Sequence, residues 1–189
     1  MSSFSLNGPG LWYMTRATGI VSLLLLTFSV FLGVLTVSRR STPKMPRFVT
    51  LGLHRNVSLL IVVFLALHVA TTVVDSYTTI DLLDAFVPFL STYRTVWLGL
   101  GAVASDLLIA VIVTSLLRER IGYRLWKLIH WLSYASWPVA LVHAWQTGTD
   151  PAADWGHYLG YACVGAVALT ALWRLVIATH RDPADTLAP

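Results

Sequence analysis

Residues 54–68 read HRNVSLLIVVFLALH, an almost wholly apolar run with His54 and His68 at its two ends. In a helix, the fourteen steps between them span about 21 Å along the axis and return the second imidazole to within about 40° of the first. The run therefore predicts a helix that presents two imidazoles on nearly one face, at two different heights.

A second stretch repeats this arrangement. Residues 130–143 read HWLSYASWPVALVH and carry His130 and His143 thirteen residues apart, which is about 19.5 Å of helix. Two such helices facing each other would pair His54 with His130 at one height and His68 with His143 at the other. The two spacings agree to within a couple of ångströms.

The second stretch fits this pairing less well in azimuth than in height. Thirteen steps of regular helix leave His130 and His143 roughly 140° apart around the axis. Pro138 lies between them, and a proline inside a helix removes a hydrogen bond and bends the local turn. We therefore expect this helix to be distorted near Trp137 and Pro138.

The composition is typical of a membrane protein. The mean hydropathy is +0.70, and only 12% of the residues are charged, about half the fraction found in water-soluble domains. The net charge of +4 comes from basic residues beside apolar runs, which indicates membrane topology and not a nucleic-acid partner. One cysteine, Cys163, allows no intramolecular disulfide and no Cys-ligated iron–sulfur cluster, and we expect it to be a packing residue.

Five apolar runs are each long enough to cross a hydrocarbon core of about 30 Å. We predict an all-α integral membrane bundle, a single domain over residues 1–189, with spans at about 12–37, 51–74, 96–117, 125–145 and 155–179. The loops near residues 38–50 and 118–124 are basic, whereas the alternate loops are acidic. The positive-inside bias then places the N-terminus outside and the C-terminus inside, so that His54 and His130 form the inner pair and His68 and His143 the outer pair. The short apolar piece at residues 82–90 is expected in the outer interface.

Four histidines inside a bilayer require an explanation, because an intramembrane ionisable group costs free energy unless it is paired or liganded. Structural zinc takes four ligands at one point, and di-iron sites in bundles use glutamates, whereas a heme takes one axial ligand on each side of its plane. Two facing imidazoles at each of two heights therefore favour two hemes. The alternatives are histidines that only pack between helices, and a cation or proton transporter that uses the histidines. We expect Asp106, the one carboxylate deep in a predicted span, to be a hydrogen-bonded core residue, and a proton relay is its alternative role.

Further residues are candidates for contacts with these hemes. Cationic side chains at the membrane faces could bind anionic propionates, although each could equally be a topology or snorkelling charge. They are Arg55, Arg124 and Lys127 near the inner level and Arg16 and Arg94 near the outer level. Trp137 could lie between two porphyrins or could be a plain packing residue. His157 and His180 stand at helix ends, where we expect interfacial polar side chains.

The spaced histidine quartet resembles the ferric reductase-like transmembrane domain, the heme-bearing core of ferric reductases, NADPH oxidases and the heme-binding subunit of a bacterial methionine sulfoxide reductase system. The run WKLIHWLSYASWPVALVHAWQTGTD, residues 126–150, is similar to short bacterial members. The resemblance implies two heme b groups with His54, His68, His130 and His143 as axial ligands, electron transfer across a bacterial inner membrane, and a role as the membrane subunit of an oxidoreductase.

The resemblance also bears on the partners. Long members of the family attach a cytoplasmic module that binds FAD and NADPH, whereas this chain ends near residue 189. We therefore expect a separate donor, either a flavoprotein or a membrane quinol, and a possible extracytoplasmic acceptor protein.

Overall fold

The computed structural model describes residues 9–37, 46–75, 79–147 and 154–179, and every regular element within these ranges is helical, as the sequence predicts. The loop residues Arg39, Arg40 and Lys44, and also His180, lie outside the described residues. The elements in chain order are α1 (Pro9–Val37), α2 (Arg47–Val74), the 3-10 helix η1 (Leu82–Ala85), α3 (Thr95–Leu116), α4 (Arg118–Ile121), α5 (Tyr123–His130), α6 (Ser133–Thr147) and α7 (Asp154–Thr179).

Within the described part of the chain, four helices are long and apolar enough to cross a membrane, namely α1, α2, α3 and α7. Large apolar side chains such as Leu59, Leu60 and Val63 of α2 stand exposed on the outside of the bundle. A surface of this kind is unstable in water and stable in lipid. The chain is therefore an integral membrane protein with the lipid bilayer as its surroundings.

The predicted fourth span, 125–145, is not one helix. It is divided into α5 and α6 by a turn at Trp131 and Leu132, and neither piece of 8 and 15 residues reaches the length of a continuous span. The predicted count of five spanning helices is thus not confirmed. At the turn the Ser133 hydroxyl donates to the His130 carbonyl at 2.7 Å, replacing the helical backbone bond that the carbonyl would otherwise accept.

The expected distortion is present, but its predicted place at Trp137 and Pro138 is wrong, because α6 is continuous through both residues. Pro138 is the sixth residue of α6, and a proline disturbs the turn that precedes it. Here that turn is the first of the helix. The interruption itself lies before that turn, at Trp131 and Leu132, where the Ser133 hydroxyl donates to the exposed His130 carbonyl.

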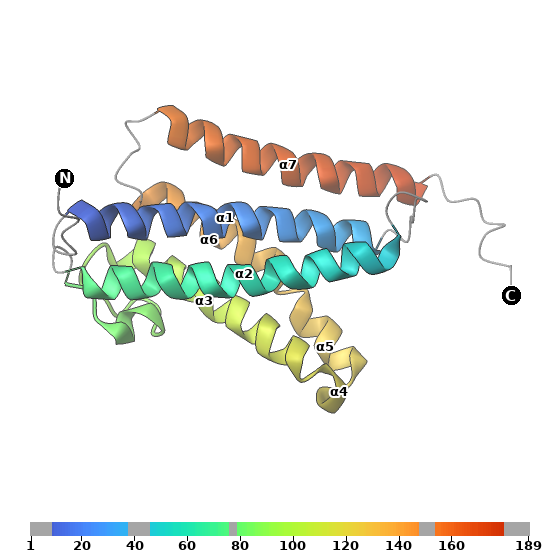
Figure 1. The fold of residues 1–189 in the computed structure, drawn as a ribbon, viewed down its shortest axis with the longest axis horizontal. Coiled ribbons are helices and arrows are strands. Elements are labelled where there is room, and N and C mark those ends of the chain that lie inside the picture. The colour runs from blue at the N-terminus through green and yellow to red at the C-terminus, as the bar shows by residue number, and fades with distance from the viewer. Residues whose placement is uncertain (1–8, 38–45, 76–78, 148–153, 180–189) are drawn as a thin grey trace, which may run out of the picture.

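Two antiparallel helix pairs form the bundle. Helix α1 runs beside α2 over its whole length, α3 packs against α6, and α7 lies along the other side of α1 (Figure 1). Helix α1 begins at the end of the bundle opposite the one where α7 ends. Helices α4 and α5 extend from the bundle beside the last turns of α3.

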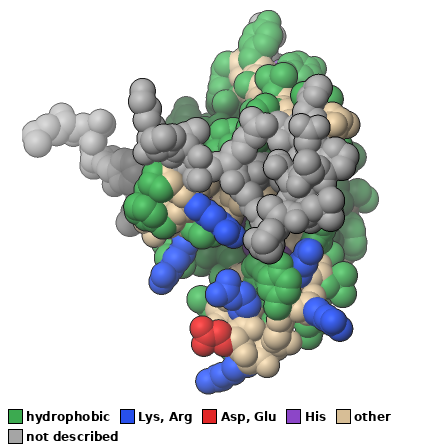
Figure 2. All heavy atoms as spheres, turned by 90° about the vertical axis from the view of Figure 1, so that its right-hand side faces the viewer, with side chains coloured by type: hydrophobic (Ala, Val, Ile, Leu, Met, Phe, Trp, Pro, Cys, Tyr) green, Lys and Arg blue, Asp and Glu red, His purple; other side chains and the backbone are tan. Residues whose placement is uncertain are grey.

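The two ends of the bundle differ in charge. Lys and Arg side chains gather at the end where α2 begins, as Figure 2 shows from that side. In the described ranges they are Arg47, Arg55, Arg118, Arg120, Arg124, Lys127 and Arg174, with Glu119 among them. The opposite end carries Asp75, Asp81 and Asp84 and fewer basic residues, Arg16 and Arg94. This separation is the one that the positive-inside bias predicts between the two faces of a membrane protein.

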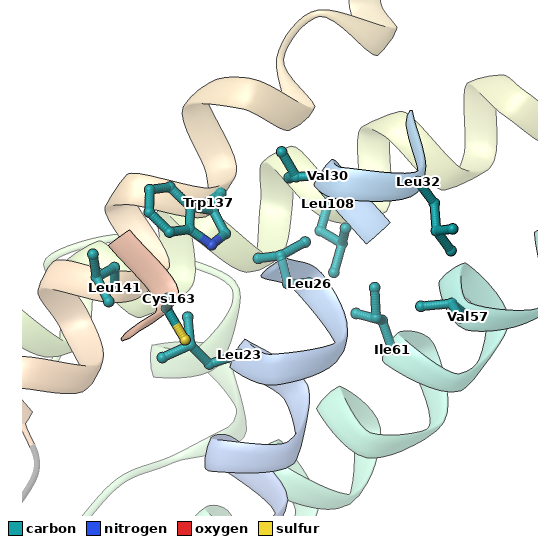
Figure 3. Packing of buried hydrophobic residues seen from close by; sticks show 10 residues of the cluster. All are labelled: Leu23, Leu26, Val30, Leu32, Val57, Ile61, Leu108, Trp137, Leu141 and Cys163. Carbon is teal, nitrogen blue, oxygen red and sulfur yellow. The ribbon is translucent and has the colours of Figure 1, made fainter. Parts of the chain in front are cut away.

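A core of apolar side chains joins the helices at mid-height (Figure 3). Leu26 of α1, Ile61 of α2 and Leu108 of α3 meet there with Trp137 of α6. Cys163 of α7 belongs to the same cluster and is 3% exposed, which confirms its expected packing role. Cluster members thus come from every long helix, and this core fixes the relative heights of the side chains around it.

Candidate functional site

The structure brings the four histidines together in two pairs at two levels of the bundle. The ring centres of His54 on α2 and His130 on α5 lie 6.3 Å apart, with the ring planes at 69°. Those of His68 on α2 and His143 on α6 lie 6.4 Å apart, at 81°. The turn between α5 and α6 allows both rings of the second stretch to meet α2, which a straight helix would prevent.

The spacing within each pair is the spacing that a shared metal ion requires. A bond from an imidazole nitrogen to a metal is about 2 Å long, and the nitrogen lies about 1 Å from the ring centre. An ion on a line between two imidazoles therefore holds the ring centres roughly 6 Å apart. The observed 6.3 and 6.4 Å match this value.

Three of the four imidazoles are held by the same kind of hydrogen bond, from Nδ1 to a backbone carbonyl. The Nδ1 atoms of His54, His68 and His143 bond the backbone carbonyls of Ser29, Thr15 and Trp97, at 3.1, 2.8 and 2.8 Å. A carbonyl can only accept, so Nδ1 carries the proton and Nε2 keeps a free lone pair. Metal-bound histidines have this second partner almost always, because it fixes the tautomer and the ring orientation.

A glycine lies one turn after each of these carbonyls, and at two of the three positions it gives the ring room to approach the helix backbone. A Cβ at Gly19 would lie 2.9 Å from the His68 ring, and one at Gly101 would lie 2.5 Å from the His143 ring. A Cβ at Gly33 would lie 3.6 Å from His54, which is ordinary contact. The sequence analysis missed these glycines, although Gly19 and Gly33 are fourteen residues apart, like His54 and His68.

His130 is held differently from the other three. Its Nδ1 atom is buried and has no hydrogen-bond partner. Its ring instead stacks on the Trp126 indole one turn earlier in α5, with the ring centres 5.0 Å apart and the planes at 30°. The inner pair therefore contains one imidazole fixed by a carbonyl and one fixed by an aromatic neighbour.

Each histidine pair lines a cavity. The outer cavity, of about 340 Å³, is bounded by His68, His143 and residues from α1, α3, α6 and α7. The inner cavity, beside His54 and His130, is smaller, at about 90 Å³. The outer volume falls in the range of about 300–1,000 Å³ that is usual for small-molecule and cofactor sites, and the inner volume falls below it.

Three aliphatic side chains, Leu26, Ile61 and Leu108, line both cavities, and we call them the aliphatic partition. Trp137, which the sequence suggested between the two levels, lines neither cavity. It is buried in the core, and its indole N–H donates to the Thr27 hydroxyl at 2.9 Å. The signal for the partition was available, since Ile61 stands midway between His54 and His68.

The candidate cations are distributed unevenly about the cavities. Arg16 lines the outer cavity, where its guanidinium lies 5.0 Å from the Trp12 ring and 5.2 Å from the Trp155 ring. The Arg94 guanidinium donates to the Gln146 carbonyl at 2.7 Å, and Arg94 does not line the cavity. The three inner candidates are exposed at the basic end of the bundle and lie outside the lining of the inner cavity: Arg55, Arg124 and Lys127.

One histidine lies closer to a cavity than expected. His157, which we expected at an exposed helix end, is half-buried, lines the outer cavity and stacks on Tyr161 of its own helix. It is not part of either histidine pair. Its position on the first turn of α7 gave no sequence signal, because only the packing of α7 on α1 brings that turn to the cavity.

The donor set at each level fits a heme better than a bare metal ion. Within the described ranges, no three His, Cys, Asp or Glu side chains converge as a metal-binding group. Each level offers two imidazoles on opposite sides, and a porphyrin supplies the remaining ligands of its own iron. The outer level fits such a group in ring spacing and in volume, and the inner level fits in ring spacing, with a cavity that would have to widen.

Comparison with known proteins agrees with this geometry. Residues 18–141 match the family model described as "Ferric reductase like transmembrane component". The match covers well over half of the chain and includes His54, His68 and His130, and it ends two residues before His143. Neither the curated proteins nor the solved structures give a match. The chain belongs to the ferric reductase-like transmembrane family, whose members are membrane redox components typically associated with heme.

Proposed function

We propose that this chain is a di-heme b-type cytochrome that carries electrons across the membrane as the membrane subunit of an oxidoreductase. His68 and His143 would hold the outer heme, and His54 and His130 the inner heme. The observation that carries the proposal is the pair of facing imidazoles at each of two levels, with ring centres 6.3 and 6.4 Å apart. Heme iron, when bound, supplies exchange of single electrons between its ferrous and ferric states.

The protein's own groups have three tasks in this mechanism. The carbonyls of Thr15, Ser29 and Trp97 accept the Nδ1 protons of three imidazoles, so that each Nε2 keeps the lone pair with which it could bind a metal. The two imidazoles of each pair would together hold one heme, which would supply single-electron chemistry there. The aliphatic partition separates the two levels with side chains that offer water no hydrogen-bond partner.

Contacts with the propionates follow from the cavity linings. Arg16, whose guanidinium lies near the rings of Trp12 and Trp155, would pair with a propionate of the outer heme. The exposed cations Arg55, Arg124 and Lys127 would be the counterparts at the inner face. Arg94 is bonded to the end of α6, and we assign it to stabilising that helix end.

We further propose that α5 and α6 together make a fifth, interrupted crossing. The opposite positions of the beginning of α1 and the end of α7 support an odd number of crossings (Figure 1). The basic end of the bundle would face the cytoplasm of a bacterial cell, with the inner membrane as the location. The N-terminus would then lie outside and the C-terminus inside.

The donor and the acceptor are proposed by class. The family resemblance supports a flavoprotein or a membrane quinol as the electron donor to the inner level. An extracytoplasmic protein would be the acceptor at the outer level. Both would have to approach the protein surface nearest the histidine pair of their own level.

A pyridine hemochrome assay and a reduced-minus-oxidised spectrum of purified protein test this function. We expect two hemes per chain, and one after either His54→Ala or His68→Ala, because each substitution removes one ligand from one pair. His157→Ala is the matched control, since His157 lines the outer cavity outside the pairs, and it should retain both hemes. Protein that stays colourless when produced in heme-supplied cells would contradict the proposal and favour transport or scaffolding.

A further inference from the structure

The two helix pairs of the bundle use one construction for holding an imidazole. In the first pair, a carbonyl and a glycine four residues later receive His68 at Thr15 and Gly19. We call this combination of a carbonyl and a glycine the carbonyl–glycine device. It recurs fourteen residues further along α1, at Ser29 and Gly33, for His54. In the second pair, α3 supplies Trp97 and Gly101 for His143.

The repeat predicts a fourth device fourteen residues after the third, at Val111 and residue 115 of α3. The sequence has Ser115 there in place of glycine. The Val111 carbonyl, which would have received His130, accepts the Ser115 hydroxyl at 2.7 Å and the Thr114 hydroxyl at 3.2 Å. Val111 and His130 both line the inner cavity, yet the buried Nδ1 atom of His130 has no partner.

Trp126 contacts both Ser115, which stands where the fourth glycine would be, and His130. Its indole N–H donates to the Ser115 hydroxyl at 3.2 Å, and its ring stacks on His130. The Arg118 guanidinium lies 5.6 Å from the centre of the same indole. Trp126 is thus anchored to α3 at one edge and supports the His130 imidazole with its face.

A stack and a hydrogen bond constrain an imidazole differently. A hydrogen bond at Nδ1 fixes one atom, one tautomer and the direction of Nε2. A stacked ring is held in its plane but can slide and turn within it, because the stacking energy depends weakly on in-plane rotation. His130 is therefore the one ligand of the quartet whose Nε2 direction depends on an aromatic neighbour.

We propose that Trp126 is the positioning residue of His130, and that the inner heme is consequently the one that the protein releases first. This inference rests on the proposed function, because it concerns the hold of each pair on a heme. Loss of a second partner to a metal-bound histidine typically costs about 10–100-fold in metal affinity. We expect the inner heme to leave faster than the outer heme by a factor in this range.

Transfer of heme from the purified, fully loaded protein to excess apomyoglobin measures this difference. The Soret change should show two phases of equal amplitude, with rates that differ by about 10–100-fold. His54→Ala should leave only the slow phase and His68→Ala only the fast phase. Equal rates for the two hemes in the unaltered protein would overturn the inference and leave the di-heme proposal standing, whereas protein without heme would overturn both.

Substitutions at position 126 separate positioning from general stability. Trp126→Leu removes the stack and should speed the inner phase at least tenfold or empty the inner site, with the outer phase unchanged as the folding control. Trp126→Phe keeps an aromatic face and should restore the inner phase to within about threefold of the original rate. Trp131→Leu is the matched control, because Trp131 is next to His130 in sequence but packs on Tyr134. Equal acceleration of both phases by Trp126→Leu, or no rescue by phenylalanine, would overturn the role of Trp126.

Discussion

The imidazoles of His68 and His143 lie so close to a neighbouring helix that only a glycine leaves room for them. Gly19 and Gly101 are in ordinary helices, so backbone conformation does not require glycine at either position. The close approach of the ring requires it, because a methyl group there would lie within 3.0 Å of the imidazole. The same approach brings each Nδ1 to a carbonyl one turn earlier. Space and hydrogen bonding are thus supplied together by two residues of one helix.

Alanine at Gly101, beside the outer pair, should have a different effect from alanine at Gly33, beside the inner pair. Gly101→Ala places a Cβ 2.5 Å from the His143 ring, which must then move away from the Trp97 carbonyl. Overpacking of this kind costs about 1–3 kcal/mol, so we expect weakened binding or loss of the outer heme alone. Heme content and the reduced α-band report the loss.

Gly33→Ala is the matched control for this prediction. Its Cβ would lie 3.6 Å from His54, a normal contact, so both hemes should remain. Equal heme loss in the two variants would show that the effect comes from helix packing in general and not from the ring contact.

The interruption between α5 and α6 sets the direction in which His130 points. Helix α6 alone would carry His143 to its pair and leave the residue thirteen positions earlier on another side. The turn at Trp131 and Leu132 changes the direction of α5 so that His130 also faces its partner. The Ser133 hydroxyl stabilises this turn by donating a hydrogen bond to the His130 carbonyl. The irregular turn between α5 and α6 thereby allows each of these helices to present one histidine to α2.

Deletion of Leu132 tests this role. Removing one residue turns α5 by about 100° and shifts it by about 1.5 Å relative to α6, which takes His130 away from His54. We expect loss of the inner heme with retention of the outer heme, measured by the pyridine hemochrome assay.

Pro138→Ala is the comparison for the deletion. Because α6 is already continuous through Pro138 and the turn lies before it, this variant should keep both hemes. Loss of the inner heme from Pro138→Ala alone would place the phase correction at the proline after all.

The helices themselves were predictable from long apolar runs, because length and hydropathy decide whether a segment crosses a bilayer. The place of the interruption was not, since it depends on one hydroxyl meeting one carbonyl after the chain has folded. The Trp97 carbonyl beside His143 is similar, because backbone acceptors leave no trace in the residue types around them. Gly19 and Gly33 did leave a trace, because their spacing of fourteen residues equals that of His54 and His68.

At the scale of the whole molecule, two helix pairs and a covering helix place the histidines at two heights. The pairing of His54 with His130 and of His68 with His143 was predictable, because rise per residue converts sequence spacing into depth. The contact of His157 with the outer cavity was not, because it depends on how α7 is placed against α1. The depth of a side chain can be predicted from its position along one helix, whereas its lateral position depends on how several helices pack together.

The proposed orientation can be tested by cysteine labelling. In a Cys163→Ala background, Glu119→Cys lies on exposed α4 at the basic end, and Thr92→Cys lies in the exposed segment before α3. A membrane-impermeant maleimide added to intact cells should label position 92 and should reach position 119 only after permeabilisation, because basic segments remain in the cytoplasm. The reverse pattern would invert the proposed topology, and labelling of both positions from outside would contradict a crossing between them.

The aliphatic partition has an electrical consequence. Leu26, Ile61 and Leu108 bind no proton, and hydrocarbon at this depth gives a small ion no hydration. In a cytochrome built this way, an electron that hops between the two levels crosses without a compensating ion at the same height. Each turnover would therefore be electrogenic, and the voltage across the bilayer would change its free energy by up to about 2.3 kcal/mol per 100 mV for each charge moved.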